Sequence, residues 1–425
     1  MPDNPVRPND AYAAMRFRNF RLLIFGRFCG QIAESMVSVG ISWELYERTR
    51  DPLALGLVGL VQVVPVLLLS LFGGYVADTW DRRKVTIISQ MVLVVCSVFL
   101  TLLSMTTGPL WLIYLVLTVI GAARAFNNPA ETALTPQTVP SEYFYSAATW
   151  NSAVWQLSAI TGPAAAGILI ALTNTAVSVY ITNIAAGLVF VVTLLLIRLN
   201  KRKEPMNTEP PLKSLKEGLV FLRNSPVIVA SITLDMFAVL FGGAVFLLPV
   251  FAKDILMVDS TGLGILRAAP SVGALLMATF LSRRPPFRNA GYVLMAAVIG
   301  FGLATIAFAL STSFWLSVFF LALTGALDNI SVVIRSMLLY TRTPDVMRGR
   351  VNSVNMIFIG ASNELGGFES GVAAALLGTV PSVIFGGIGT IVVVLLVGLL
   401  SPDLRRLDRL QEPAPEVEEP QPRAV

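Results

Sequence analysis

Residues 73–84 read Gly-Gly-Tyr-Val-Ala-Asp-Thr-Trp-Asp-Arg-Arg-Lys, and they separate two long apolar runs. Each flanking run is long enough to cross a bilayer as a helix, which takes about 20 residues. The turn between them is short and basic. Because Lys and Arg gather in the cytoplasmic loops of membrane proteins, this stretch predicts a tight hairpin at the cytoplasmic face. The other segments of the chain are placed relative to this hairpin.

The composition is typical of a polytopic membrane protein. The chain has 425 residues, of which 55% are hydrophobic and 13% are charged, whereas soluble domains carry about 25% charged residues. The apolar runs are far longer than the roughly ten residues of a barrel strand and do not alternate, so an all-α membrane protein is predicted. The basic residues behind the net charge of +5 lie in loops, where they set topology, and no nucleic-acid partner is expected.

Residue types that catalysis or metal binding requires are absent or lie in apolar surroundings. The sequence has no histidine, and Cys29 and Cys96 fall inside apolar runs, where packing is their expected role. It has no Walker loop and no Gly-x-Ser-x-Gly elbow. We therefore expect no enzyme activity, no cofactor, no metal site and no use of ATP. No cleavable signal peptide is expected, because the first apolar run is too long for one.

Twelve membrane spans are expected, and the longest polar loop divides them into six and six. Their ranges are 20–46, 53–78, 84–106, 109–133, 143–171, 175–199, 226–252, 260–282, 289–311, 314–341, 347–376 and 381–400. The expected domains are a cytoplasmic segment at 1–19, a six-helix bundle at 20–199, a cytoplasmic linker at 200–225 with an amphipathic helix at 214–223, a second six-helix bundle at 226–401 and a disordered cytoplasmic tail at 402–425.

The basic residues also set the expected orientation. With the N-terminus inside, most of the 31 Lys and Arg residues fall on the cytoplasmic side, and only Arg48, Arg50 and Lys253 fall outside. This asymmetry predicts that both termini are cytoplasmic.

The two halves resemble each other as repeats. Val139-Pro140 followed by Asn151 resembles Thr343-Pro344 followed by Asn355, at an offset of about 204 residues. Phe17-Arg18-Asn19 resembles Leu222-Arg223-Asn224 at nearly the same offset. Duplicated bundles of membrane helices bind their substrates near the midplane, at the interface between the halves.

The hairpin resembles the signature of the major facilitator superfamily, Gly-x-x-x-Asp-Arg-x-Gly-Arg-Arg/Lys, which lies between the second and third spans. The matching positions are Gly74, Asp78, Arg82 and Arg83, whereas Thr79 and Asp81 replace the first Arg and the second Gly. A second stretch, 162–167, resembles part of the antiporter signature of the superfamily. Within the superfamily the chain looks most like the drug and siderophore exporter branch, which includes enterobactin exporters and macrolide efflux proteins.

The resemblance to this branch rests on 74–85, on 128–130, on 212–222 and on 343–352. It implies two pseudo-symmetric six-helix bundles in which spans one, four, seven and ten line a central cavity. It does not identify the substrate.

Charged residues within the spans cost about 2.5–3.5 kcal/mol each on insertion scales, so they mark polar cavities or bonded pairs. Three pairs of charges lie seven residues apart, which places the two members on one helix face. These pairs are Arg27 with Glu34, Arg124 with Glu131, and Asp328 with Arg335, and Asp235 lies in span seven.

Proton coupling and substrate binding are assigned to this polar set. The candidates are Arg27, Gln31, Glu34, Arg124, Asn127, Asn151, Trp155, Asp235, Asp328 and Arg335. Glu34 and Asp235 are the expected proton carriers, because a carboxyl group in a partly dehydrated cavity can load and release protons. The alternative role for Glu34 and Asp235 is a structural ion pair, and the alternative for Arg124 is a partner for Glu34 or Asp328. Trp155 either contacts substrate or packs between helices. Arg267, Glu364 and Glu369 are expected to pair with one another in the C-terminal half.

A cytoplasmic gate is implied by the family resemblance. In the superfamily, the Asp at the end of span two meets the start of span eleven. Asp78 is therefore expected to contact the positive N-terminal end of that helix in the outward-open state, helped by Arg348 or Arg350. The gate residues are Gly74, Asp78, Arg82, Arg83 and Arg348.

The function expected from these features is proton-coupled efflux of amphipathic small molecules by alternating access, in a monomer of the bacterial cytoplasmic membrane. Its partners would be the substrate, protons or sodium ions, and the lipid bilayer. The alternatives are uptake of a nutrient or lipid, either proton-coupled or facilitated, and, in another class, a transporter-like receptor or membrane scaffold.

Overall fold

The computed structural model describes residues 12–198, 211–284 and 287–407, and its long elements are all helices. The first group is α1 (Arg18–Thr49), α2 (Pro52–Thr79), α3 (Arg82–Met105), α4 (Leu110–Thr138), α5 (Phe144–Thr173) and α6 (Val177–Leu196). The second group is α8 (Pro226–Phe241), α10 (Ser260–Leu281), α11 (Ala290–Leu310), α12 (Phe314–Arg342), α13 (Asp345–Leu377) and α14 (Thr379–Leu400). Two short helices, α7 (Pro211–Arg223) and α15 (Pro402–Arg405), lie outside these groups.

Eleven helical segments in the described part of the chain are long and apolar enough to cross a membrane, which confirms a polytopic all-α protein. Their bounds lie within a few residues of the expected spans. The 33-residue helix α13 is not among the eleven, and its polar side chains include Asn363, Glu364 and Glu369. Parts of the expected N-terminal segment, linker and tail lie outside the described residues, namely 1–11, 200–210 and 408–425, and the expected amphipathic helix at 214–223 falls within α7. The start of the predicted tail forms α15, in which Leu404 is buried.

The hairpin quoted above ends α2 and begins α3. The Thr79 hydroxyl donates to the carbonyl oxygen of Tyr75 at 2.8 Å in the last turn of α2. The Asp81 carboxylate accepts the backbone N–H groups of Arg83 and Lys84 at 3.0 and 3.3 Å, as the N-cap of α3. A cap of this type stabilises a helix by about 1 kcal/mol. The two residues that depart from the superfamily signature therefore have local structural roles.

The seventh expected span is broken rather than continuous. α8 ends at Phe241, and the chain continues through η3 (Gly243–Leu247), α9 (Leu248–Val250) and the π-helical η4 (Phe251–Ile255). A Cβ atom on Gly243 would lie 2.4 Å from the carbonyl oxygen of Gly366 in α13, so this close approach requires glycine. Irregular backbone within a membrane is tolerated where it is buried in protein or lines a cavity. We therefore expect the irregular segment to be buried in protein or to line a cavity beside α13.

The two helix groups meet along α2 with α13 and along α5 with α10. Their backbones nearly touch at glycines, since a Cβ on Gly56 would lie 2.9 Å from the Cα of Gly371. A Cβ on Gly264 would lie 2.6 Å from the carbonyl oxygen of Pro163. Small residues allow membrane helices to approach this closely.

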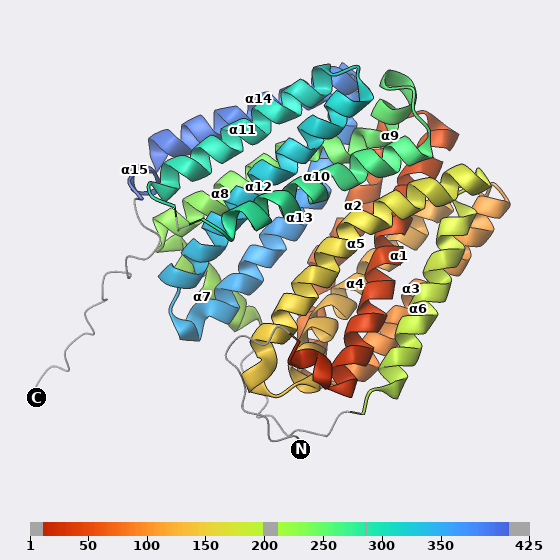
Figure 1. The fold of residues 1–425 in the computed structure, drawn as a ribbon, viewed down its shortest axis with the longest axis horizontal. Helices are drawn as coiled ribbons and strands as arrows, with labels where there is room; N and C mark the ends of the chain where they lie inside the picture. The colour runs from red at the N-terminus through yellow and green to blue at the C-terminus, as the bar shows by residue number, and fades with distance from the viewer. Residues whose placement is uncertain (1–11, 199–210, 285–286, 408–425) are drawn as a thin grey trace, which may run out of the picture.

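These contacts define two ends of the molecule. We call the end with the α1–α2 turn at Arg50 and with η4 the closed end, and the end with the α2–α3 hairpin and the start of α13 the open end. The helix groups meet toward the upper right of Figure 1 and separate toward the lower left, on the side of α7.

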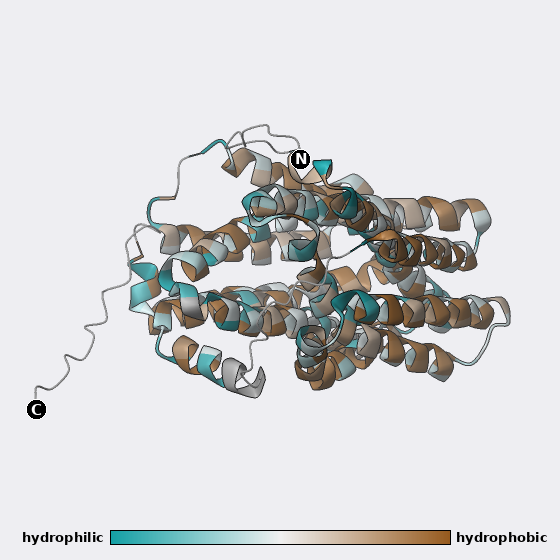
Figure 2. Ribbon diagram, turned by 90° about the horizontal axis from the view of Figure 1, so that it is seen from below, coloured by the Kyte–Doolittle hydropathy of each residue, from teal (hydrophilic) through white to brown (hydrophobic). Residues whose placement is uncertain are grey.

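The outer faces of the helices are apolar. Large hydrophobic side chains are exposed along them, among them Leu68, Phe72, Phe99 and Leu395. Figure 2 shows hydrophobic residues along the helices and many of the hydrophilic residues at turns and helix ends. Apolar surface of this extent belongs in contact with lipid.

Candidate functional site

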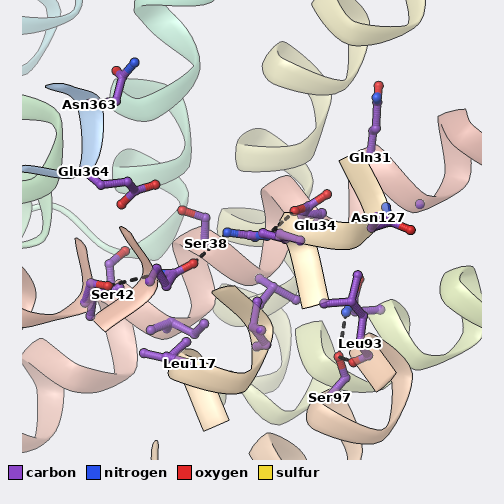
Figure 3. Close-up of a pocket in the computed structure, with 18 of the residues that line it drawn as sticks. Gln31, Glu34, Ser38, Ser42, Leu93, Ser97, Leu117, Asn127, Asn363 and Glu364 are labelled. Carbon is purple, nitrogen blue, oxygen red and sulfur yellow. Dashed lines mark hydrogen bonds and ion pairs between the residues drawn. The ribbon is translucent and has the colours of Figure 1, made fainter. Parts of the chain in front are cut away.

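A cavity of about 450 Å³ lies between the two helix groups. Helices α1, α2, α3, α4 and α6 form most of its wall, and the second group adds Phe246, Arg267, Gly360, Asn363 and Glu364. Figure 3 shows Gln31, Glu34 and Asn127 on one side of this view, with Asn363 and Glu364 on the other. We call this space the central cavity.

An ion pair between α1 and α4 lies on the wall of the central cavity. The Nε atom of Arg124 is 2.7 Å from a carboxylate oxygen of Glu34, and its Nη1 atom donates to the side-chain oxygen of Gln62 at 2.6 Å. The Glu34 side chain remains 48% exposed. An exposed carboxylate beside a guanidinium can exchange its partner for a bound molecule or a proton.

A second ion pair joins the same two helices farther toward the open end. Arg27 donates through Nε to Glu131 at 2.5 Å and through Nη2 to the Glu131 carbonyl oxygen at 2.8 Å. It also bonds the side chains of Asn151 and Thr135. The other carboxylate oxygen of Glu131 accepts a hydrogen bond from Asn127 at 3.0 Å. Because Arg27 is buried and makes four hydrogen bonds to three residues, it fastens α1 to α4 and α5.

Each of the two observed ion pairs joins α1 to α4. The spacing of seven placed Arg27 with Glu34 and Arg124 with Glu131 on shared faces, and the structure pairs Arg27 with Glu131 and Arg124 with Glu34. α1 and α4 run in opposite directions, so the residue nearer the open end of one helix meets the residue nearer the open end of the other. Each charge is therefore neutralised by the neighbouring helix.

The C-terminal candidates lie away from the central cavity. Asp235 of α8 and Arg335 of α12 form an ion pair, and both residues are at least 95% buried. Asp328 lies two turns from Arg335 on α12 and lines a separate cavity in the second helix group. The family resemblance implied that spans seven and ten line the central cavity. The seventh span does so through Phe246 of η3, whereas no residue of α12 lines it and α10 and α13 supply the rest of the second group's share. The broken seventh span and the polar face of α13 account for this difference.

Two further candidates have other surroundings. Asn151 accepts from Arg27 and is not among the residues that line the central cavity. Trp155 is 63% exposed on α5, while its neighbour Gln156 donates to the Ser271 carbonyl oxygen of α10 at 2.7 Å. Adjacent residues of a helix point about 100° apart, so only Gln156 faces the contact between the groups.

The pairing expected among Arg267, Glu364 and Glu369 is not formed in the described structure. Arg267 donates to the Ser38 hydroxyl of α1 at 2.8 Å, across the interface between the groups. Glu369 accepts from Ser370 at 3.3 Å. Arg267 and Glu364 both line the central cavity, so they add one positive and one negative group to its wall.

Several uncharged polar residues of the cavity wall were not predicted. They are Ser38, Ser42, Gln62, Gln90, Ser97 and Asn183, and Asn183 donates to Ser97 at 2.7 Å. Gln90 and Ser97 also lie seven residues apart in an apolar helix. The spacing rule applied to charges would have found them had it been extended to uncharged side chains.

The gate candidates make contacts only within their own helix group in the described structure. Asp78 lies 3.8 Å from Arg82, and Arg82 donates to the carbonyl oxygens of Ala77 and Ala133. Arg83 donates to Leu194 and Leu195.

Arg348 and Gly74 are the two remaining gate candidates at the open end. Arg348 pairs with Asp345 at 2.7 Å and lies over the ring of Tyr340. A Cβ on Gly74 would meet no atom within 4 Å. Among the described residues, no contact joins Asp78 to α13, and its ion-pair partner is Arg82 of its own helix group.

Polar contacts between the helix groups occur at the closed end. Asp254 of η4 bonds Tyr46 and pairs with Arg50 at 3.3 Å. Lys253 pairs with Glu47 and lies 4.3 Å from the centre of the Trp43 ring. These contacts join the end of α1 to η4.

Comparisons with known proteins agree with this arrangement. Residues 9–423 match the family described as transmembrane secretion effector. The enterobactin exporter EntS of Citrobacter koseri is 27% identical over 399 residues, which cover 93% of this chain and 95% of that protein. EntS of Escherichia coli O157:H7 is 26% identical over 389 residues, which cover 91% and 92%.

Solved structures share the fold at low sequence identity. A bacterial homologue of the lysosomal transporter Spinster, in an inward-facing and occupied conformation, has a TM-score of 0.74 at 12% identity and covers 93% of this chain and 98% of its own. A bacterial homologue of the iron transporter ferroportin, in an inward-facing state, has a TM-score of 0.68 at 18% identity, with coverage of 92% and 99%.

Proposed function

The chain belongs to the transmembrane secretion effector family of the major facilitator superfamily, and we propose that it exports amphipathic small molecules by proton-coupled alternating access. It is a multi-pass membrane transporter and not an enzyme. Siderophores are the first substrates to test, because its curated relatives are exporters of enterobactin. Drugs of the macrolide or dye type are the second.

The observation that carries the proposal is the polar central cavity between two helix groups that meet at one end. Its volume of about 450 Å³ lies in the range of cavities that hold small molecules, roughly 300–1,000 Å³. Its wall combines paired charges with amide and hydroxyl groups and with Phe190 and Phe246. Such a wall suits a molecule that has both polar and apolar parts.

The Glu34–Arg124 pair supplies a means of coupling. A proton on Glu34 would cancel its charge and release Arg124 to hold an acidic group of the substrate. Loss of that proton would restore the ion pair and displace the substrate. Asp235, the other expected carrier, is buried against Arg335, and we assign it to holding α8 against α12.

The proposal also fixes an orientation. We place the closed end outside and the open end in the cytoplasm, so that both termini are cytoplasmic and the described state faces inward. With α13 counted as a span, the chain has twelve spans in two six-helix bundles. It would act as a monomer surrounded by lipid in a bacterial cytoplasmic membrane.

The test uses the full-length protein in proteoliposomes with an imposed pH gradient. Enterobactin, erythromycin and ethidium are offered separately, and both counterflow and gradient-driven transport are measured. We expect at least one compound to move against its gradient. Glu34→Gln should abolish the gradient-driven movement, because a neutral amide can neither pair with Arg124 nor release a proton.

The control variant is Glu142→Gln, which changes an exposed carboxylate in η2 (Ser141–Tyr143) and should behave as the unmodified protein. The proposal is wrong if no compound moves, or if Glu34→Gln and Asp235→Asn both retain full gradient-driven transport. Saturable binding without flux would indicate a receptor, and a sodium gradient that replaces the pH gradient would identify sodium as the coupling ion.

A further inference from the structure

A second cavity, of about 250 Å³, lies inside the C-terminal helix group beside the break in α8. Among the described residues that line it, Asp328 alone carries a charged side chain. Phe246 and Asn363 line both this cavity and the central cavity. The two spaces therefore share a wall, and Asn363 can be located at that wall in Figure 3.

The carboxylate of Asp328 has no hydrogen-bond or ion-pair partner in the described structure, although donors lie around the same cavity. The Thr305 hydroxyl donates to Phe301 at 2.9 Å, and the Thr324 hydroxyl donates to Leu321 at 2.7 Å. The Asn363 amide donates to Ile359 at 2.9 Å. The two hydroxyls are occupied within their own helices, Asn363 uses one of its two N–H groups in the same way, and none of these bonds reaches Asp328.

The charged groups on the neighbouring helices are also occupied. Arg335 is paired with Asp235, and Arg267 of α10 donates to Ser38 and to the Val245 carbonyl oxygen. Helix α11 has no charged residue. Glu364 of α13 lines the central cavity, whose wall also includes Arg124 and Arg267.

The N-terminal half shows what a balanced site looks like. Arg124 and Glu131 precede Asp328 and Arg335 by 204 residues, the offset of the sequence repeat. At these positions the two halves carry charges of opposite sign. Arg124 is balanced by Glu34, whereas the described residues offer Asp328 no such partner. An uncompensated charge within a bilayer is costly, so Asp328 requires a cation or a proton.

We propose that Asp328 is a proton-binding site, separate from the substrate cavity, and that its proton is exchanged during transport. This inference deepens the proposed function and rests on it. A proton adds to the carboxylate to give the neutral acid, and it leaves again to water on the central-cavity side of the wall that Phe246 and Asn363 form. No other group is consumed or oxidised.

The location of Asp328 also connects its charge to the packing of α8 on α12. Asp328 and Asp235 line the same small cleft, together with Ser331. An ionised Asp328 would compete with Asp235 for Arg335. Loss of the Asp328 proton would thus weaken the Asp235–Arg335 pair. In this way proton release would alter the packing of α8 on α12 in the C-terminal helix group.

The proton can be detected without any substrate. The full-length protein in nanodiscs is titrated with acid while infrared difference spectra record the C=O stretch of protonated carboxyl groups. We expect one protonated carboxyl band to vanish in Asp328→Asn and to shift in Asp328→Glu. Glu364→Gln, which changes an acid with cations nearby, is the matched control and should keep the Asp328 band.

A second measurement separates this inference from the proposed function. In proteoliposomes loaded with enterobactin, Asp328→Asn should lower pH-driven transport to that of protein-free liposomes and leave counterflow unchanged. A carboxyl band that survives in Asp328→Asn overturns the inference, whatever the transport result. A band that vanishes in Asp328→Asn, with no pH-driven flux in the unmodified protein, supports the proton site and contradicts the proposed coupling.

Discussion

Ion pairs cross between the helix groups at the closed end but stay within one group toward the open end. At the closed end, Arg50 and Lys253 each pair with an acid of the other group, and the Arg50–Asp254 pair is about half exposed. Nearer the open end, Arg27 with Glu131 and Arg335 with Asp235 are buried pairs within one group. Breaking a buried ion pair strongly destabilises the fold, whereas an exposed ion pair contributes little to stability.

This difference separates what stays fixed from what can change. The buried pairs hold each group together where the other group gives no support. The exposed pairs and the glycine contacts hold the two groups to each other. A transition that opens the closed end would break only the second class of contacts.

Breaking one buried pair should have the largest effect on stability. Arg335→Leu would leave Asp235 buried without a partner, at a cost of about 3–5 kcal/mol. Thermal unfolding in detergent, followed by size-exclusion chromatography, measures the loss. The double variant Asp235→Leu with Arg335→Leu should recover most of the stability, since it leaves no unpaired charge. A single variant as stable as the parent would show that this pair does not hold α8 to α12.

Filling a glycine contact at the closed end should have the next largest effect. In Gly371→Val the new Cβ would lie 2.6 Å from the Cα of Gly56, and overpacking of this kind costs about 1–3 kcal/mol. We expect the helix groups to separate at the closed end and transport to stop. When Gln62→Cys is added to this variant, the new thiol should react with a reagent supplied on the side of the closed end. Gly349→Ala at the open end, where a Cβ meets nothing within 4 Å, is the control. Equal transport by the two variants would contradict the prediction.

Removing an exposed pair at the closed end should have a smaller effect. Asp254→Asn takes away the charged partner of Arg50 and weakens the bond to Tyr46, and exposed pairs contribute roughly 0.2–1 kcal/mol. Spin-label distance measurements should show a modest rise in the fraction of molecules whose two helix groups are separated at the closed end. High salt should reproduce the change in the parent protein and have little further effect in the variant. A variant that responds to salt as strongly as the parent would count against the assignment.

Changing Asp78 at the open end should have the smallest effect on the described state. Its side chain is 66% exposed and lies 3.8 Å from Arg82, so Asp78→Asn should leave thermal stability nearly unchanged. If Asp78 contacts α13 when the open end closes, the variant should still slow transport and raise cytoplasmic accessibility. Unchanged transport and accessibility would remove Asp78 from the gate.

Sequence reasoning located the helices better than their partners. Runs of apolar residues locate spans because a bilayer sets their length, and even the bounds of α2 agree with the expected 53–78 within a residue. The same reasoning overlooked the break after Phe241, although Gly242 and Gly243 mark it in the sequence. Hydropathy is insensitive to such a break, because the irregular segment is as apolar as the helix that it interrupts.

The site was predicted in part, for a related reason. Helical spacing shows which residues share a face, and three of the residues that it picked out, Arg27, Glu34 and Arg124, line the central cavity. Spacing alone does not show which helix lies opposite, so it did not identify Glu131 as the partner of Arg27, whereas Arg124 pairs with Glu34, one of its two expected partners. Asp328 was grouped with the central cavity, yet its surroundings depend on how α8 bends and how α13 packs.

The unequal wall of the central cavity has a consequence for any molecule held there. Five helices of the N-terminal group form most of that wall, and the C-terminal group adds a small part of it. A bound molecule would keep its neighbours on α1 and α4 while those on η3, α10 and α13 are replaced. The bound molecule would then move only a short distance through the protein, and most of the movement would be made by the helices of the C-terminal half.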